Sequence, residues 1–190
     1  QASLVWDQLF LKHSPVSEAC RGVITVLNAL GISPRKRDLN ALRKWFASLR
    51  MEDYVTRCME AANVSKICMT NSPFDDVERP FWQHGFQRDE RFTSALRIDP
   101  LLLDWPVAAR QLTQWGYGVS ASLNAKTIAG VRHFLEDWTH LLNAQYLMVS
   151  LPPEFQFPNK SHCSQLITKA VLPHCEEHNL PFALMMGVKR

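Results

Sequence analysis

The 190-residue chain lacks Cys-x-x-Cys pairs, a recognisable signal peptide and any apolar run long enough to span a bilayer. Its five cysteines are scattered and odd in number, so we expect reduced thiols in a cytoplasmic protein without a membrane partner. Internal repeats and low-complexity segments are also absent. These absences argue against a disulfide-rich secreted domain, a membrane-spanning protein and a repeat array.

The chain also lacks a strong charge of either sign. Its 21 Lys and Arg residues exceed the 18 Asp and Glu residues by only three, and the basic residues are spread along the chain. The one small cluster, PRKRD at 34–38, is interpreted as a solvated turn between helices. Such weak basicity gives no reason to expect a nucleic-acid partner. A hydrophobic content of 46% instead suits a globular domain with a sizeable core.

Helical periodicity dominates the first sixty residues, and a different pattern follows. Apolar residues recur at three- and four-residue spacing in the segments 16–32, 37–50 and 51–64. Beyond them, four short apolar runs are predicted strands, at 65–70, 92–98, 144–151 and 181–188. Helical patterns at 104–116, 124–143 and 160–179 separate these runs, and Pro173 predicts a kink in the last of them.

This alternation of strands and helices predicts an α/β fold with βαβ units and a parallel sheet. In such sheets the functional site lies at the carboxyl ends of the strands, which here carry polar residues, glycine and proline. Four strands correspond to half of an eight-stranded barrel. The chain does not begin with Met and stops at Arg190 directly after a predicted strand, so we expect a piece of a longer protein.

The stretch SALRIDP at 94–100 ends a predicted strand with two opposite charges. Residues at i and i+2 of a strand point to the same side, so Arg97 and Asp99 are expected to share one face. Two interpretations remain open, a local salt bridge and the edge of a binding site.

Two histidines, His174 and His178, stand at i and i+4 of a predicted helix. This spacing could bind a metal ion, but the helix offers no Glu-based motif and no third ligand. The prediction is therefore that both side chains are exposed to solvent.

Several stretches in order resemble the uronate (glucuronate) isomerases of the amidohydrolase superfamily, in particular the smaller Bacillus-type branch. They are SPVSEACRGV (14–23), VSKICMTNSPFDDVER (64–79), SALRIDPLL (94–102), QLTQWGYGV (111–119), YLMVSLPPEFQFP (146–158) and LPHCEEHNLPFALMMGVK (172–189). The resemblance covers nearly the whole chain. It implies an internal fragment of a (β/α)8 TIM barrel, with a helical insertion at 1–63 and barrel strands two to five within 64–190.

The resemblance also implies an activity, the isomerisation of D-glucuronate to D-fructuronate and of D-galacturonate to D-tagaturonate. A uronate carries a carboxylate, which a guanidinium binds in a bidentate fork, so Arg97 is the predicted carboxylate-binding residue. Asp99 is expected to orient Arg97. The sequence leaves open whether a proton or a hydride moves between C2 and C1.

Three other positions are candidates for substrate binding. Thr70 and Asn71 end a predicted strand and could bond sugar hydroxyls, although Asn and Ser before Pro also favour a turn. Arg190, after the last predicted strand, could help to hold the carboxylate; the alternative is a chain end in solvent.

The resemblance implies a divalent metal, commonly zinc, held by a His-x-His pair and an Asp. Here no two histidines are separated by one residue, and Met185 stands where larger relatives have a histidine on strand five. The metal ligands are therefore expected outside this chain, which alone is expected to be inactive. Two alternatives remain: a metal-dependent amidohydrolase-type hydrolase, and a non-catalytic α/β binding domain. Open sheet edges would also allow a homo-oligomer.

Overall fold

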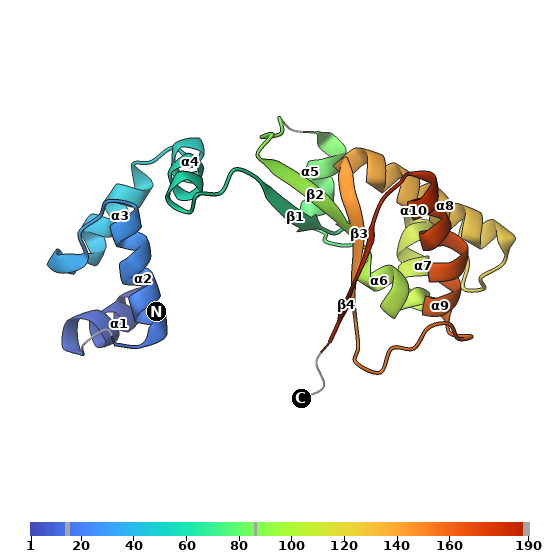
Figure 1. Cartoon of the computed structure of the whole chain (residues 1–190), viewed down its shortest axis with the longest axis horizontal. Helices are drawn as coiled ribbons and strands as arrows, with labels where there is room; N and C mark the ends of the chain where they lie inside the picture. Colours follow the sequence, from blue (N-terminus) through green and yellow to red (C-terminus); the bar gives the residue numbers. More distant parts are fainter. Residues whose placement is uncertain (14–15, 86, 188–190) are drawn as a thin grey trace. The chain divides into compact units, whose positions relative to one another are not determined.

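The computed structural model describes residues 1–13, 16–85 and 87–187. The chain divides into two compact units, Gln1–Ser65 and Lys66–Arg190 (Figure 1). Each unit has its own hydrophobic cluster.

The first unit is helical. Its elements are α1 (Ala2–Trp6), the π-helical η1 (Asp7–Lys12), α2 (Glu18–Ala29), the 3-10 turn η2 (Pro34–Lys36), α3 (Leu39–Ala47) and α4 (Met51–Ala61). Trp6 and Phe10 stack at a centroid distance of 4.4 Å and pack on buried Cys20. The three predicted helices are confirmed with shorter bounds, and α1 and η1 agree with the helical character predicted for the first sixty residues, although no separate helix was predicted there.

The second unit contains a four-stranded parallel sheet. Its strands are β1 (Ile67–Asn71), β2 (Phe92–Arg97), β3 (Ala144–Leu151) and β4 (Phe182–Met186), and they lie side by side in sequence order. All four predicted strands are therefore confirmed, as is their parallel pairing. The α/β class is confirmed as well.

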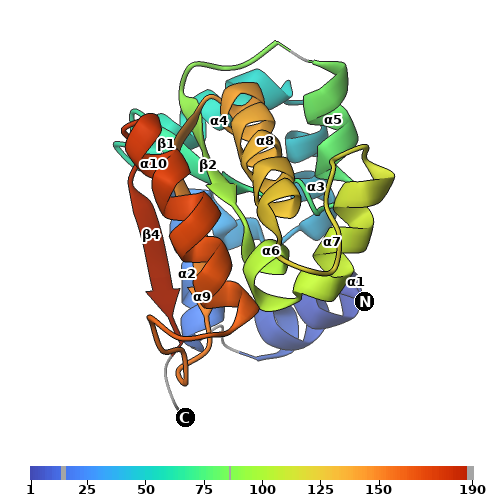
Figure 2. The same ribbon diagram turned by 90° about the vertical axis from the view of Figure 1, so that its right-hand side faces the viewer.

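Helices cover one face of this sheet (Figure 2). They are α5 (Glu78–His84), α6 (Asp99–Leu103), α7 (Trp105–Gln114), α8 (Ala125–Leu142), α9 (His162–Leu166), the π-helical η3 (Ile167–Val171) and α10 (Leu172–Glu177). The core forms between strands and helices, where Leu96 and Leu147 meet Phe134 and Leu135 of α8, all of them inaccessible to solvent. Burial of these side chains, at about 1.5–3 kcal/mol each, is the main force that holds the layers together.

The predicted helix at 160–179 is irregular just before Pro173, where the kink was expected. A π-helical segment, Ile167–Val171, separates α9 from α10. Proline has no N–H to donate, and its ring collides with the carbonyl four residues earlier. A widened turn ahead of Pro173 is one way in which a helix accommodates that residue.

The register of the sheet assigns each strand residue to a face, since paired residues of parallel strands point to the same side. Asn71, Leu96 and Leu147 occupy equivalent positions on the helix-covered face. Arg97 pairs with Met148 on the other face. This second face is the one on which a site at the carboxyl ends of the strands can form.

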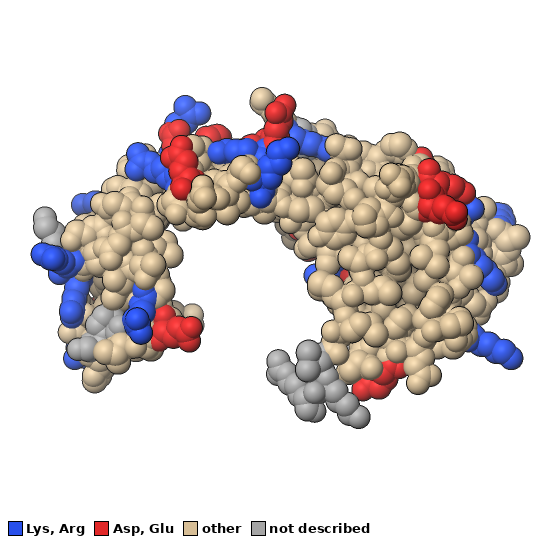
Figure 3. Space-filling view, in the orientation of Figure 1, with Lys and Arg blue, Asp and Glu red and all other residues tan. Residues whose placement is uncertain are grey.

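Among the described residues, no helix is long and apolar enough to cross a membrane. On the face of the second unit seen in Figure 3, acidic and basic side chains are dispersed over a largely uncharged surface.

Candidate functional site

Arg97 and Asp99 meet, but not as neighbours on a strand. Arg97 is the last residue of β2, Ile98 leaves the strand with φ −119° and ψ 24°, and Asp99 begins α6. The prediction that both side chains share a strand face is therefore wrong in its geometry. The turn at Ile98 brings the carboxylate back beside the guanidinium instead.

The resulting contact is a bidentate ion pair at the carboxyl end of β2. Arg97 Nε donates to Asp99 Oδ2 and Arg97 Nη2 donates to Oδ1, each at 2.9 Å. The Ser150 N–H on β3 also donates to Asp99 Oδ1 at 3.2 Å, and Arg97 Nη2 donates to the Ser150 hydroxyl at 3.2 Å. The Asp99 side chain is 15% exposed and that of Arg97 39%. The hydrogen bond to Asp99 raises the pKa of Arg97 above its ordinary value.

Part of the Arg97 guanidinium remains available. Asp99 occupies the Nε–Nη2 edge, while Nη1 has no hydrogen-bond partner among the described residues. Nη1 carries two N–H groups that can donate to an incoming oxygen anion. Asp99 accepts three hydrogen bonds, two of them from the Arg97 guanidinium.

Thr70 lies on the same face of the sheet as Arg97, on the neighbouring strand. It pairs with Ala95, which stands two residues before Arg97 on β2, and its side chain is exposed. The structure thus places Thr70 and Arg97 on one surface.

Asn71 points to the opposite, helix-covered face and is almost fully buried. Its Nδ2 donates to Glu78 Oε2 of α5 at 3.1 Å, whereas Oδ1 has no partner among the described residues. The structure does not bring Asn71 together with Arg97. Its observed contact links the end of β1 to α5.

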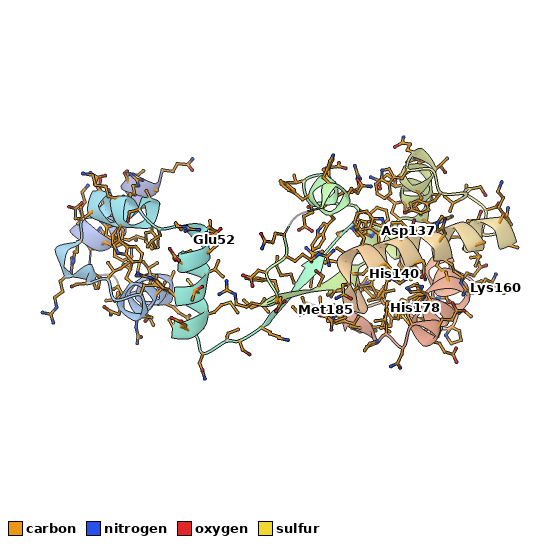
Figure 4. All side chains as sticks on the ribbon, turned by 90° about the horizontal axis from the view of Figure 1, so that it is seen from above. Glu52, Asp137, His140, Lys160, His178 and Met185 are labelled. Carbon is orange, nitrogen blue, oxygen red and sulfur yellow. The ribbon has the colours of Figure 1, made fainter. Side chains whose placement is uncertain are left out.

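Of the remaining sequence candidates, Arg190 lies outside the described residues. Met185 lies on β4, opposite Ser150 in the register, with a half-exposed side chain (labelled in Figure 4). Ser150 itself was missed by sequence reasoning, because its role depends on how β2 and β3 pair. The only sequence signal was its place two residues before Pro152-Pro153, at the end of a predicted strand.

The metal ion implied by the resemblance does not fit the described residues at this edge of the sheet. The carboxylate beside Arg97 already accepts three hydrogen bonds, and no group of three metal-ligating side chains gathers around it among the described residues. Within the described ranges, one group of three or more His, Cys, Asp or Glu side chains could share an ion, and it comprises Glu136, His140 and His178. These residues lie elsewhere in the unit, so no catalytic step is assigned here to a metal ion.

A cavity of about 670 Å³ opens at the other edge of the sheet. Lys66, Phe92, Leu142 and Asn143 are among the residues that line it, and they stand at or next to the amino ends of strands. Sites in parallel α/β sheets form at the carboxyl ends of the strands. The carboxyl end of β2 at Arg97 is therefore the candidate site, and this cavity is not.

The predicted exposure of His174 is wrong. Its side chain is buried, and its Nε2 lies 2.9 Å from the Thr139 hydroxyl of α8. Burial and the neighbouring His178 lower the pKa of His174, which favours its neutral form. The adjacent group of Glu136, His140 and His178 was not predicted. Its sequence signals were the i, i+4 spacing of Glu136 and His140 in the predicted helix at 124–143 and the presence of His178, which was considered only together with His174.

Among solved structures, a known protein matches this chain along its whole length. A crystal structure of a uronate isomerase from Bacillus halodurans is 48% identical to this chain and superposes with a TM-score of 0.92. The match covers 100% of this chain and 45% of the other, so this chain spans less than half the length of that isomerase. No family model and no curated protein matches. The resemblance to a uronate isomerase inferred from the sequence is thus confirmed over the whole length of this chain.

Proposed function

We propose that this chain forms part of an enzyme that interconverts D-glucuronate with D-fructuronate and D-galacturonate with D-tagaturonate. Its similarity over the whole chain to a uronate isomerase supports the reaction. The observation that carries the proposal is the half-exposed guanidinium of Arg97, held at the carboxyl edge of a parallel sheet with two N–H groups open.

We also propose that the sheet belongs to a (β/α)8 barrel, as strands two to five, with 1–63 as a helical insertion. Parallel sheets in proteins are covered on both faces. Strand β4 is not: Leu184 and Met186 on one face and Met185 on the other are each about half exposed. Further chain packed on both faces would bury them. Ligands for a divalent metal such as zinc would then come from residues other than those described here.

In this proposal Arg97 binds and orients the substrate. The Nη1 N–H groups donate to the uronate carboxylate, which fixes the far end of the open-chain sugar relative to C1 and C2. Asp99 and Ser150 act as positioning residues, because they hold the guanidinium plane in one orientation. Thr70, on the same face, is placed to bond a sugar hydroxyl.

The test is an Arg97→Met substitution in the complete isomerase that carries this sequence. A charged hydrogen bond contributes about 1.5–3 kcal/mol, so KM for glucuronate is expected to rise by roughly 10- to 150-fold. The matched control is Arg91→Met. Arg91 forms the same type of pair with Asp89, two residues away, just before the other end of β2, with Nε and Oδ1 2.9 Å apart.

The control should leave KM unchanged. Unchanged KM and kcat in the Arg97 variant would remove its assigned role. Absence of activity with any uronate in the unsubstituted complete enzyme would instead overturn the proposed reaction.

A further inference from the structure

Two histidines and a glutamate from separate parts of the chain converge in the second unit. Glu136 Oε1 lies 2.6 Å from His140 Nε2, and Glu136 Oε2 lies 2.6 Å from His178 Nε2. The three side chains each offer one ligand atom, and these atoms all lie within 4.8 Å of one another. Figure 4 shows His140 and His178 adjacent, on α8 and at the end of α10.

This cluster lies at the edge of the sheet opposite to Arg97. His140 stands in the last turn of α8, which leads through Asn143 into the first residue of β3. His178 caps α10, four residues before β4 begins at Phe182. Both histidines are thus near the amino ends of strands, whereas Arg97 ends one. The cluster is therefore separate from the proposed substrate site.

The helices hold the three side chains in place. Glu136 and His140 are four residues apart and so lie on one face of α8. That helix packs against η3 and α10, which fixes the position of His178. Buried His174 supports the cluster, with its ring centroid 4.4 Å from that of His178 and its Nδ1 3.7 Å from Glu136 Oε2. The packing of the helices therefore holds the three side chains close together before an ion binds.

We propose that Glu136, His140 and His178 form a binding site for a divalent transition-metal ion of the zinc type. Two imidazoles and one carboxylate are a ligand set that zinc uses in proteins, with the fourth position left to water. Magnesium and calcium prefer oxygen ligands and suit this set poorly. The cluster is open to solvent, since the His140 side chain is 69% exposed, so an ion can reach it.

An ion requires the ligand atoms to rearrange around it. With bonds of about 2.0–2.1 Å in a tetrahedral site, ligand atoms stand about 3.3 Å apart. The present N···O contacts of 2.6 Å would open by less than 1 Å, and the other ligand atoms, which lie within 4.8 Å of one another, would close by up to about 1.5 Å. The Nε2 atoms would then direct lone pairs to the ion, and their hydrogens would move to Nδ1 or to solvent.

The competing interpretation is a cluster that is only hydrogen-bonded. In that case each Nε2 carries a hydrogen and donates it to one oxygen of Glu136. The two interpretations place the same atoms together but differ in what Nε2 does. They are therefore distinguished by metal binding itself and not by the positions of the side chains.

The test uses Co²⁺ as a spectroscopic probe for zinc. The 190-residue chain is freed of metal with a chelator, and CoCl₂ is added while the visible absorption is recorded. Binding should saturate at one Co²⁺ per chain with the intense bands of low-coordinate cobalt, and ZnCl₂ should abolish them. A near-ultraviolet cobalt–thiolate band would indicate that one of the five cysteines binds the ion, so we expect no such band.

Variants assign the signal to the cluster. His140→Gln and His178→Gln should each weaken cobalt binding at least tenfold, while far-UV circular dichroism stays unchanged. The control is His133→Gln on the same helix, where a 68% exposed histidine lies 3.4 Å from Asp137 at i, i+4, with no third ligand group among the described residues. It should bind cobalt like the unsubstituted chain.

Because the ion binds the folded state, zinc should also raise the melting temperature of the unsubstituted chain and of the His133→Gln variant. It should not raise that of His140→Gln or His178→Gln. The proposal would be overturned if the folded unsubstituted chain showed no cobalt absorption, or only the weak absorption of six-coordinate cobalt. Equal binding after the His140→Gln and His178→Gln changes are combined would also overturn it. Either result would leave a hydrogen-bonded cluster.

Discussion

Gly130 stands in the interior of α8, where helix propensity alone predicts that alanine would stabilise the protein. In helix interiors alanine is more favourable than glycine by about 0.8–1.0 kcal/mol in helix propensity. The packing of this glycine opposes the gain. A Cβ added at Gly130 would lie 2.8 Å from Val119 Cγ1 and 2.9 Å from the Gly118 carbonyl oxygen. Both distances are shorter than real Cβ contacts, so the loop before α8 would have to move.

The net effect follows from the two opposing contributions. Overpacking a well-packed site costs typically about 1–3 kcal/mol. The cost here should lie in the upper part of that range, because one of the colliding atoms is a backbone oxygen whose displacement shifts the chain. Subtraction of the propensity gain leaves Gly130→Ala destabilising, with a loss of about 1–2 kcal/mol in the free energy of unfolding.

Urea unfolding followed by circular dichroism measures this loss for the second unit. The control is Ala129→Gly at the adjacent, exposed position of the same helix, which should cost about 1 kcal/mol through propensity alone. A second control, Gly22→Ala in α2, has nothing within 4 Å of the added Cβ and should stabilise the first unit. A Gly130→Ala protein as stable as the unsubstituted chain would refute the argument from close packing.

Two further predictions concern α8 and the cysteines. Asn124 Oδ1 accepts a hydrogen bond from the Thr127 N–H at 2.9 Å, so Asn124→Ala should cost about 1 kcal/mol in urea unfolding, and Asn124→Ser should restore most of it. Burial raises the pKa of Cys175 to about 11, so at pH 8 only about one thiol in a thousand is ionised. Iodoacetamide should therefore modify exposed Cys68 in the native chain and modify Cys175 only after the chain is unfolded. Mass spectrometry measures the modification of each cysteine, and equal rates for Cys68 and Cys175 in the native chain would contradict this prediction.

The sequence predicts the strands and long helices because their signals are local. The runs at 92–98 and 144–151 are short, apolar and bounded by turn residues, and β2 and β3 match them closely. The elements that were missed are short. Helix α6 has five residues and is placed by the turn at Ile98 and by the packing of Leu101 and Leu102, neither of which periodicity reveals.

The site was predicted in part. The opposite charges of Arg97 and Asp99, close to a strand end, made a contact one of two open interpretations, but the turn at Ile98 that produces it was not predicted. Ser150 comes from another strand, more than fifty residues away, and only the register of β2 and β3 reveals it. The histidine cluster was missed for the same reason, because the packing of α8 on α10 supplies ligands that neither helix contains alone.

The end of β2 at Arg97 explains why a salt bridge and a binding site are compatible interpretations of SALRIDP. Had the strand continued, Asp99 would stand about 7 Å further along the same face, and Arg97 would have to extend along the strand to reach it. The turn at Ile98 folds the carboxylate back, so that both of its oxygens meet Nε and Nη2. The ion pair therefore occupies one edge of the guanidinium and holds its plane, while Nη1 stays open to a ligand. Removal of Asp99 would then cost orientation as well as stability.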